Sequence, residues 1–174
     1  TINEEWNKNF AYGVWVTGAN LNTGRAVLGS AGTRDSALAF GGLATAPTAV
    51  TEIYNGTAWG EVNDLNTERR QLAGAGTQTS ALAFGGENPG TVAFDITESW
   101  NGTSWTEVAD LNTGKNNLAG DGADNTSALA FGGGTPSATA TTESWNGSSW
   151  TEVNDLNTAR YGLAGTGIAT AALA

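Results

Sequence analysis

The sequence predicts an all-β repeat protein, on three observations: a repeat of about 45 residues, a side-chain period of two, and a recurrent Asn-Gly pair. The Leu-Asn-Thr motif shows the repeat most clearly. Its leucine recurs at spacings of 44, 46 and 45 residues, at Leu21, Leu65, Leu111 and Leu156. A fixed period of this length is typical of propellers and other repeat architectures.

The second copy of the repeat illustrates the elements that we expect. Residues 80–84 read Ser-Ala-Leu-Ala-Phe, with larger and smaller side chains on alternate sides of a strand. We expect a first strand near 72–76, a second at 80–84, a third ending at Trp100 and a fourth starting near Trp105. Asn101-Gly102 separates the last two, and Asn-Gly is the preferred pair of a two-residue type I′ hairpin. Four antiparallel strands per repeat predict a propeller blade.

Half-repeats stand on either side of three complete repeats, which span about 19–63, 64–109 and 110–154. We expect two strands near 5–7 and 15–18, and two more near 163–167 and 170–174. Pairing of these halves makes a fourth blade, shared by 155–174 and 1–18, and closes a single domain, 1–174, without an open sheet edge. Small residues in inner strands and tryptophan in outer ones fit the wedge of a four-bladed ring. A fragment of a six- or seven-bladed ring has the same pattern, and this alternative stays open.

Composition excludes several classes of function. The 174 residues include no Cys, His or Met, so we expect no histidine-containing triad, thiol nucleophile, disulfide or Cys/His zinc site. A net charge of −10 disfavours nucleic acid and anionic membrane surfaces as partners. Apolar runs stay below the roughly 18 residues of a spanning helix, so no membrane insertion is expected. We expect no enzyme activity, no catalytic residues, no metal and no cofactor.

One basic residue recurs in each repeat shortly after the fourth strand: Arg25, Arg69, Lys115 and Arg160. These side chains could form a ring of cations at a pore mouth and bind an anionic sugar or carboxylate. Alternatively, each pairs with an acid of the third or fourth strand, such as Glu61, Glu98, Glu107 or Glu152. The second interpretation is favoured, because a position that recurs with the fold usually serves the fold.

A polar residue precedes each Leu-Asn-Thr motif, at Asn20, Asp64, Asp110 and Asp155. Calcium binding is one interpretation, but the repeats lack the dense alternating acids of a calcium loop. Turn formation is favoured, because Asp and Asn side chains accept hydrogen bonds from the backbone N–H two residues on.

The order of the motifs resembles the kelch repeat. A strand ending in Gly85-Gly86 is followed fourteen residues later by Trp100, then by a second Trp five residues beyond, then by a turn and Arg. The resemblance covers all 174 residues in about four copies, and a looser similarity extends to kelch-like repeats of marine phage and bacterial surface proteins. The chain departs from the kelch pattern at Lys115, in its many Ala and Gly residues, and in the nine-residue spacing from Trp6 to Trp15.

The kelch resemblance implies that the loops after Gly-Gly and the connections between repeats form one partner-binding face. The loops at 43–47, 87–90 and 134–137 differ in sequence while their flanks hardly change. The candidate ligand-binding residues lie in these loops, in the connections and in the basic ring: Thr45, Glu68, Glu87, Asn88, Thr135, Arg25, Arg69, Lys115 and Arg160.

We therefore expect a non-catalytic recognition and structural module on a virion or extracellular surface. It would bind glycan or protein partners, including virion proteins or other copies of itself, as in adhesion. The copper-radical kelch enzymes need His ligands and a Cys cross-linked to Tyr, which this chain lacks. Glycoside hydrolysis needs one asymmetric pair of carboxylates, whereas the acids here recur in the repeats. The open alternative is a fragment of a six- or seven-bladed intracellular kelch adaptor, although a charge of −10 argues against the basic pocket of that class.

Overall fold

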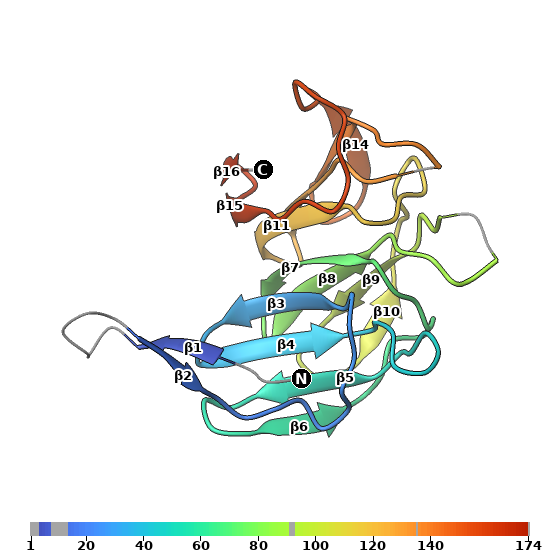
Figure 1. Ribbon diagram of the computed structural model, residues 1–174. Helices are drawn as coiled ribbons and strands as arrows, with labels where there is room; N and C mark the ends of the chain where they lie inside the picture. The colour runs from blue at the N-terminus through green and yellow to red at the C-terminus, as the bar shows by residue number, and fades with distance from the viewer. Residues whose placement is uncertain (1–3, 8–13, 91–92, 135, 174) are drawn as a thin grey trace.

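The computed structural model describes residues 4–7, 14–90, 93–134 and 136–173, and the regular structure in these ranges is β-strand (Figure 1). Three four-stranded antiparallel sheets follow one another along the chain. The first sheet comprises β3 (Gly29–Thr33), β4 (Ser36–Phe40), β5 (Thr51–Tyr54) and β6 (Trp59–Val62). The second comprises β7 (Ala73–Thr77), β8 (Ser80–Phe84), β9 (Thr97–Trp100) and β10 (Trp105–Glu107). The third comprises β11 (Ala119–Asp124), β12 (Ser127–Phe131), β13 (Thr142–Trp145) and β14 (Trp150–Val153).

Two hairpins flank the three sheets, β1 (Glu4–Asn7) with β2 (Val14–Thr17), and β15 (Thr166–Ile168) with β16 (Ala171–Leu173). They stand where the sequence predicts half-repeats. Each is a separate two-stranded sheet, and no pairing joins β16 to β1 within the described ranges. Repeated four-stranded sheets consistent with blades are thus confirmed, while the fourth blade stays a prediction.

The strand positions agree closely with those expected from the sequence. The expected second strand of the second repeat is β8, β9 ends at Trp100 and β10 starts at Trp105. The first strand, β7, begins one residue later than expected, at Ala73. The strand alternation and the aromatic positions therefore located these elements correctly.

The turn between the third and fourth strands corrects the expected two-residue type I′ hairpin. Trp100 pairs with Trp105, so four residues, 101–104, form the loop. Asn101 Oδ1 accepts hydrogen bonds from the N–H groups of Thr103 (2.9 Å) and Ser104 (3.0 Å), and Gly102 has a positive φ of 91°. The asparagine serves as a side-chain acceptor that closes the turn, and the left-handed conformation falls on the glycine alone.

Neighbouring sheets pack through opposite faces of their second strands. Leu82 and Phe84 belong to a buried cluster with residues of the third sheet. Ala81 and Ala83, on the other face of β8, belong to a cluster with Leu38 and other residues of the first sheet. This arrangement confirms the predicted period of two, because each sheet presents large residues to the next sheet and alanines to the previous one.

An aromatic contact joins each sheet to the next. Phe40 of the first sheet lies edge-on to Trp105 of the second, with ring centroids 4.9 Å apart, and the Trp105 indole N–H donates to Thr51 Oγ1 at 3.1 Å. Phe84 and Trp150 repeat this contact at 5.0 Å between the second and third sheets. Gly74 leaves room for the ring, because a Cβ there would lie 2.5 Å from Phe40 Cζ.

The first strands of the sheets lie side by side along the middle of the molecule. β7 contacts both β3 and β11, and β11 also contacts β15 (Figure 1). The connections between sheets and the loops after the second strands lie at one end of these strands, here called the loop face. Many of the positions at which the repeats differ lie on this face and in the interior channel described below.

Candidate functional site

Three of the four recurring cations are buried and paired with glutamates of the third strands. Arg25 pairs with Glu52, Arg69 with Glu98, and Lys115 with Glu143, whose Oε1 lies 2.9 Å from Nζ. The side chains of all three pairs are between 0% and 2% exposed, so these cations do not stand at a pore mouth. The interpretation as ion pairs within the repeat is confirmed for these three positions, but Glu98 is the one partner among the four acids that the sequence suggested. Glu61, Glu107 and Glu152 lie on the fourth strands and are exposed, whereas Glu52 and Glu143 of the third strands are the partners of Arg25 and Lys115.

Arg69 shows what the buried pair does. Its Nε donates to the Gly85 carbonyl at 3.0 Å and its Nη2 to the Ala83 carbonyl at 3.2 Å, while Nη1 binds Glu98. Burial lowers the pKa of Arg69 from its ordinary value, and the negative charge of Glu98 acts in the opposite direction. The pair fastens the connection from the previous sheet to the body of its own sheet.

Arg160, the fourth recurring cation, lies in a different environment. It is exposed, and its Nε donates to the Thr158 carbonyl at 3.3 Å. Within the described part of the chain it has no ion pair. Of the predicted basic ring, Arg160 is therefore the member that reaches the surface.

The aspartates before the Leu-Asn-Thr motifs accept hydrogen bonds from backbone N–H groups, but not from the N–H groups that the sequence suggested. Asp64, Asp110 and Asp155 accept from the N–H of Thr51, Thr97 and Thr142, at 3.0, 3.0 and 3.2 Å. The partner is thirteen residues earlier in the chain, at the start of the third strand, instead of two residues later. The turn interpretation was right about backbone bonding and wrong about the partner. In the described ranges no group of three or more acids is placed to hold a metal ion.

The candidate loop residues are only partly brought together. Thr45 and Glu68 are exposed, Asn88 is half-buried, and Thr135 lies outside the described residues. Glu87 is half-buried and accepts from Arg70 Nη2 at 2.9 Å and from Asn116 Nδ2. A three-residue network thus joins one loop to the connections into the second and third sheets.

Arg70 and Asn116 were not identified from the sequence. Each directly follows a recurring cation, at a position where the other repeats have Ala26 and Tyr161. This departure from the repeat is the signal that would have identified them. We call the three side chains Arg70, Glu87 and Asn116 the loop-face network.

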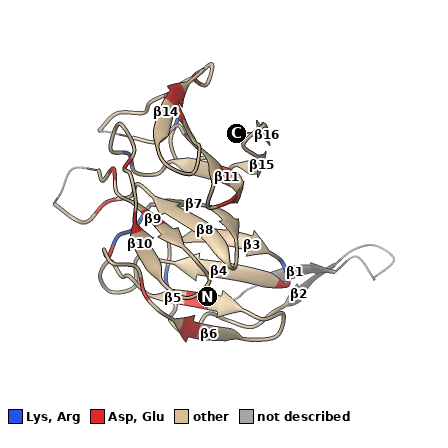
Figure 2. Cartoon of the chain, turned by 180° about the vertical axis from the view of Figure 1, so that it is seen from behind, with Lys and Arg blue, Asp and Glu red and all other residues tan. Residues whose placement is uncertain are grey.

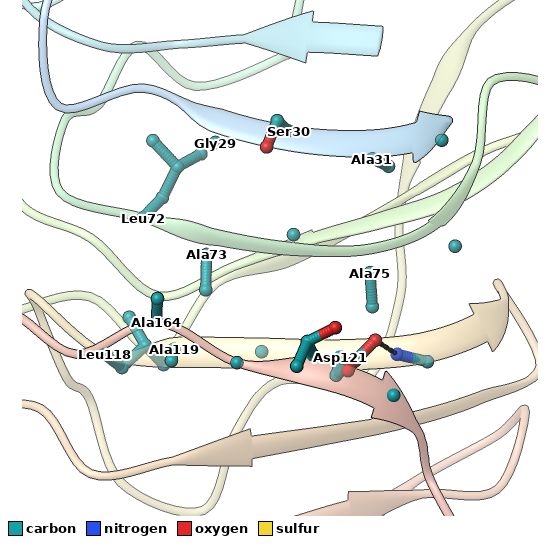
Figure 3. Close-up of a pocket in the computed structure, with 18 of the residues that line it drawn as sticks. Gly29, Ser30, Ala31, Leu72, Ala73, Ala75, Leu118, Ala119, Asp121 and Ala164 are labelled. Carbon is teal, nitrogen blue, oxygen red and sulfur yellow. Dashed lines mark hydrogen bonds between the residues drawn. The ribbon is translucent and has the colours of Figure 1, made fainter. Parts of the chain in front are cut away.

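A cavity of about 700 Å³ runs between the first strands of the sheets (Figure 3). Most of its lining is glycine, alanine and leucine from β3, β7, β11 and residues 163–167. Ser30, Asp121 and Thr166 break this pattern with polar side chains. Asp121 Oδ1 accepts from the N–H of Gly122 at 2.8 Å, and Oδ2 is buried without a hydrogen-bond partner in the described structure.

A second cavity of about 200 Å³ lies next to the first on the loop face and shares Leu28, Leu72, Leu118 and Leu163 with it. Four residues with left-handed backbone line this second cavity: Val27, Gln71, Asn117 and Gly162, with φ of 50°, 56°, 51° and 67°. A backbone ladder joins them, from Gln71 N to Val27 O (2.8 Å), Asn117 N to Gln71 O (2.9 Å) and Gly162 N to Asn117 O (2.8 Å). We call these four residues the mouth ring. A positive φ is uncommon for a non-glycine residue and is most costly for a β-branched one such as Val27. The backbone hydrogen bond that joins Val27 to Gln71 recurs along the ring and stabilises this conformation.

Charge outside the buried pairs is mostly negative. The outermost strands β6 and β14 carry the exposed acids Glu61 and Glu152, which are drawn red in Figure 2. With 17 acidic and 7 basic residues, this surface repels polyanions. The described structure contains no helix that is long and apolar enough to cross a membrane.

The comparisons with known proteins found no matching family model and no matching curated protein. The site is therefore interpreted from its geometry alone. It combines a small-residue channel, a mouth ring with two amide side chains, and the loop-face network next to that ring.

Proposed function

We propose that this chain is a kelch-type β-propeller that acts as a non-catalytic recognition and structural module on a virion or extracellular surface. In this proposal the three sheets are blades, and the hairpins β1–β2 and β15–β16 complete a fourth. The taper from Ala and Gly in the first strands to Trp in the outer ones favours a small ring.

The division between repeated and non-repeated polar residues carries this proposal. The recurring glutamates and three of the recurring cations are buried in ion pairs within the blades. Polar residues that differ between repeats lie at the mouth ring, in the loop-face network and in the channel, and also in the turns between the first and second strands. Those at the mouth ring and in the channel line cavities. Residues that serve only the fold should recur with it, so a partner is expected to contact the positions that do not recur.

A neutral glycan is the partner that this chemistry favours. The half-buried amides of Gln71 and Asn117 both donate and accept hydrogen bonds, as sugar hydroxyl groups require. Val27, 46% exposed, supplies an apolar contact beside them. A protein partner on the same face remains the other form of the proposal, and the net charge disfavours an anionic one.

Binding of the purified chain to an array of neutral and acidic glycans tests the proposal. We expect neutral glycans to bind, and the double variant Gln71→Ala, Asn117→Ala to weaken binding by about tenfold or more, as loss of central contacts does. Thr103→Ala is the matched control, because Thr103 is exposed in the turn of β9 and β10, at the opposite end of the blade. Equal binding by the double variant, or no glycan bound, would overturn the glycan form of the proposal.

A further inference from the structure

The same carboxylate-binding arrangement occurs in all three sheets. A third-strand glutamate accepts from the backbone N–H of the asparagine in Leu-Asn-Thr, at 2.7 Å in each case, and pairs with the cation three residues after that asparagine. The asparagine Nδ2 also donates to the carbonyl of the fourth-strand tryptophan at 2.9 to 3.2 Å. The Leu-Asn-Thr segment is therefore a carboxylate receptor for a strand of the next sheet.

The fourth copy of this segment has the same backbone anchors. Leu156 N donates to Ala140 O (2.9 Å), Arg160 N to Thr139 O (3.2 Å), and Gly133 N to Arg160 O (2.9 Å). Leu65 and Arg69 make the corresponding bonds in the second copy, at 3.0, 3.4 and 2.9 Å. The receptor at Asn157, Thr158 and Arg160 is thus held in the same shape, but no carboxylate occupies it in the described structure.

We propose that residues 157–160 form a receptor for a strand carboxylate, and that the hairpin β1–β2 of the same chain supplies it through Glu4. This inference rests on the fourth blade of the proposed function and adds the site that holds it. Trp6 pairs with Trp15 across β1 and β2, as Trp100 pairs with Trp105 across β9 and β10. Glu4 stands two residues before Trp6 in the sequence, as Glu98 stands two before Trp100.

Thr142 gives an independent reason to expect this hairpin. The hydroxyl oxygens of Thr51 and Thr97 accept from the indole N–H of a tryptophan of the following sheet, at 3.1 and 3.0 Å. Thr142 is the corresponding residue of the third sheet, and its hydroxyl donates to Ala140 O at 3.5 Å just as that of Thr51 donates to Ala49 O at 3.4 Å. Among the hydrogen bonds of the described residues, no indole N–H donates to Thr142. Because Trp15 pairs with Trp6 as Trp105 pairs with Trp100, Trp15 is the tryptophan that would donate to the Thr142 hydroxyl once β1–β2 docks beside β16.

A cysteine pair tests the docking. Leu82 pairs with Ser99 and Leu129 with Ser144, so docking of β1 onto β16 places Glu5 opposite Leu173. Directly opposed residues of antiparallel strands lie about 4.5 to 5.5 Å apart at Cα, within disulfide range. The chain has no cysteine, so Glu5→Cys with Leu173→Cys should give one disulfide within a monomer under mild oxidation. No disulfide, or one only between two chains, would overturn the proposal together with the closed fourth blade.

Neutralising the receptor tests the carboxylate site separately, in the same double-cysteine protein. Arg160→Gln should slow disulfide formation by about tenfold, Glu4→Gln should do the same, and both together should slow it no further, as expected for a direct pair. Arg34→Gln is the control, since Arg34 is an exposed cation paired with Asp35. A disulfide that forms at an unchanged rate in Arg160→Gln would leave the fourth blade standing and overturn the receptor.

Discussion

The second and third sheets follow the same pattern of strands but fasten their incoming connections with different cations. In the second, the Arg69 guanidinium binds Glu98 and also donates to the carbonyl oxygens of Thr67, Ala83 and Gly85, at 3.0, 3.2 and 3.0 Å. In the third, the Lys115 ammonium binds Glu143 at 2.9 Å and reaches the Thr141 carbonyl at 3.5 Å.

The comparison shows which interactions of the buried cation are common to both sheets and which are made by Arg69 alone. A buried positive charge opposite the glutamate is common to both sheets. The bonds to the second strand depend on the planar fork of arginine, which has five donors in fixed directions where lysine has a single compact charge. Charge neutralisation therefore holds the connection, and the carbonyl bonds add to it.

The largest effect is expected from Arg69→Leu, which tests the common requirement. It leaves the Glu98 carboxylate, 0% exposed, without its counter-charge. Removing one partner of a buried pair costs about 3–5 kcal/mol. Urea unfolding should show this loss, whereas Arg34→Leu, at an exposed pair, should cost less than about 1 kcal/mol.

The double variant Arg69→Leu, Glu98→Leu sharpens the same test. With both charges gone, much of the stability lost in Arg69→Leu should return, because apolar residues can replace a buried pair at little cost. A double variant less stable than Arg69→Leu would show instead that Glu98 is needed mainly for its bonds to the N–H groups of Asn66 and Thr67.

A smaller effect is expected from Gly74→Ala, which alters the contact between the first and second sheets. The added Cβ would meet Phe40 Cζ and the Ser30 carbonyl, both at 2.5 Å. Overpacking of this kind costs about 1–3 kcal/mol. Gly60→Ala is the control, because no atom lies within 4 Å of its added Cβ. Equal stability of the two variants by thermal unfolding would show that the aromatic contact adapts freely.

Exchanging the two cations should give effects of opposite sign. Arg69→Lys loses bonds to carbonyl oxygens and should destabilise by about 1–2 kcal/mol, since a net hydrogen bond contributes about 1 kcal/mol. Lys115→Arg offers the corresponding bonds to the third sheet and should stabilise. Urea unfolding of both variants provides the measurement. Destabilisation by both would mean that each cavity is shaped to its own side chain.

The sequence predicted the strands because their signals are local. Alternation in 80–84 and the aromatic pair at Trp100 and Trp105 depend only on neighbouring residues and on burial. The burial of Arg69 and the identity of the N–H group that donates to Asp64 depend on residues thirteen or more positions away, and the spacing of motifs does not predict those contacts. The loop-face network was missed for a related reason, since Arg70 and Asn116 become neighbours only when two connections meet at Glu87.

The turns between the first and second strands also differ between the second and third sheets. The third sheet has one residue more between its leucine and its second strand, and the register of β11 shifts between Gly122 and Asp124. Asp124 Oδ1 there accepts from the hydroxyl (2.6 Å) and the N–H (2.7 Å) of Thr126. In the second sheet Thr77 Oγ1 accepts from the N–H of Ser80 at 3.1 Å, so that turn has no charge.

The smallest effect is expected from Thr126→Val, and it should depend on pH. The hydroxyl of Thr126, followed by its N–H, holds the pKa of the Asp124 carboxyl below its ordinary value. A lowered folded-state pKa gives stability that is complete above the unfolded pKa of about 3.9 and is lost as pH falls through the folded value. Thr126→Val should therefore lose less stability than the unmodified chain on acidification, whereas Thr79→Val, beside the uncharged turn, should follow the unmodified chain. Parallel pH curves for both variants would mean that solvent screens the Asp124 charge completely.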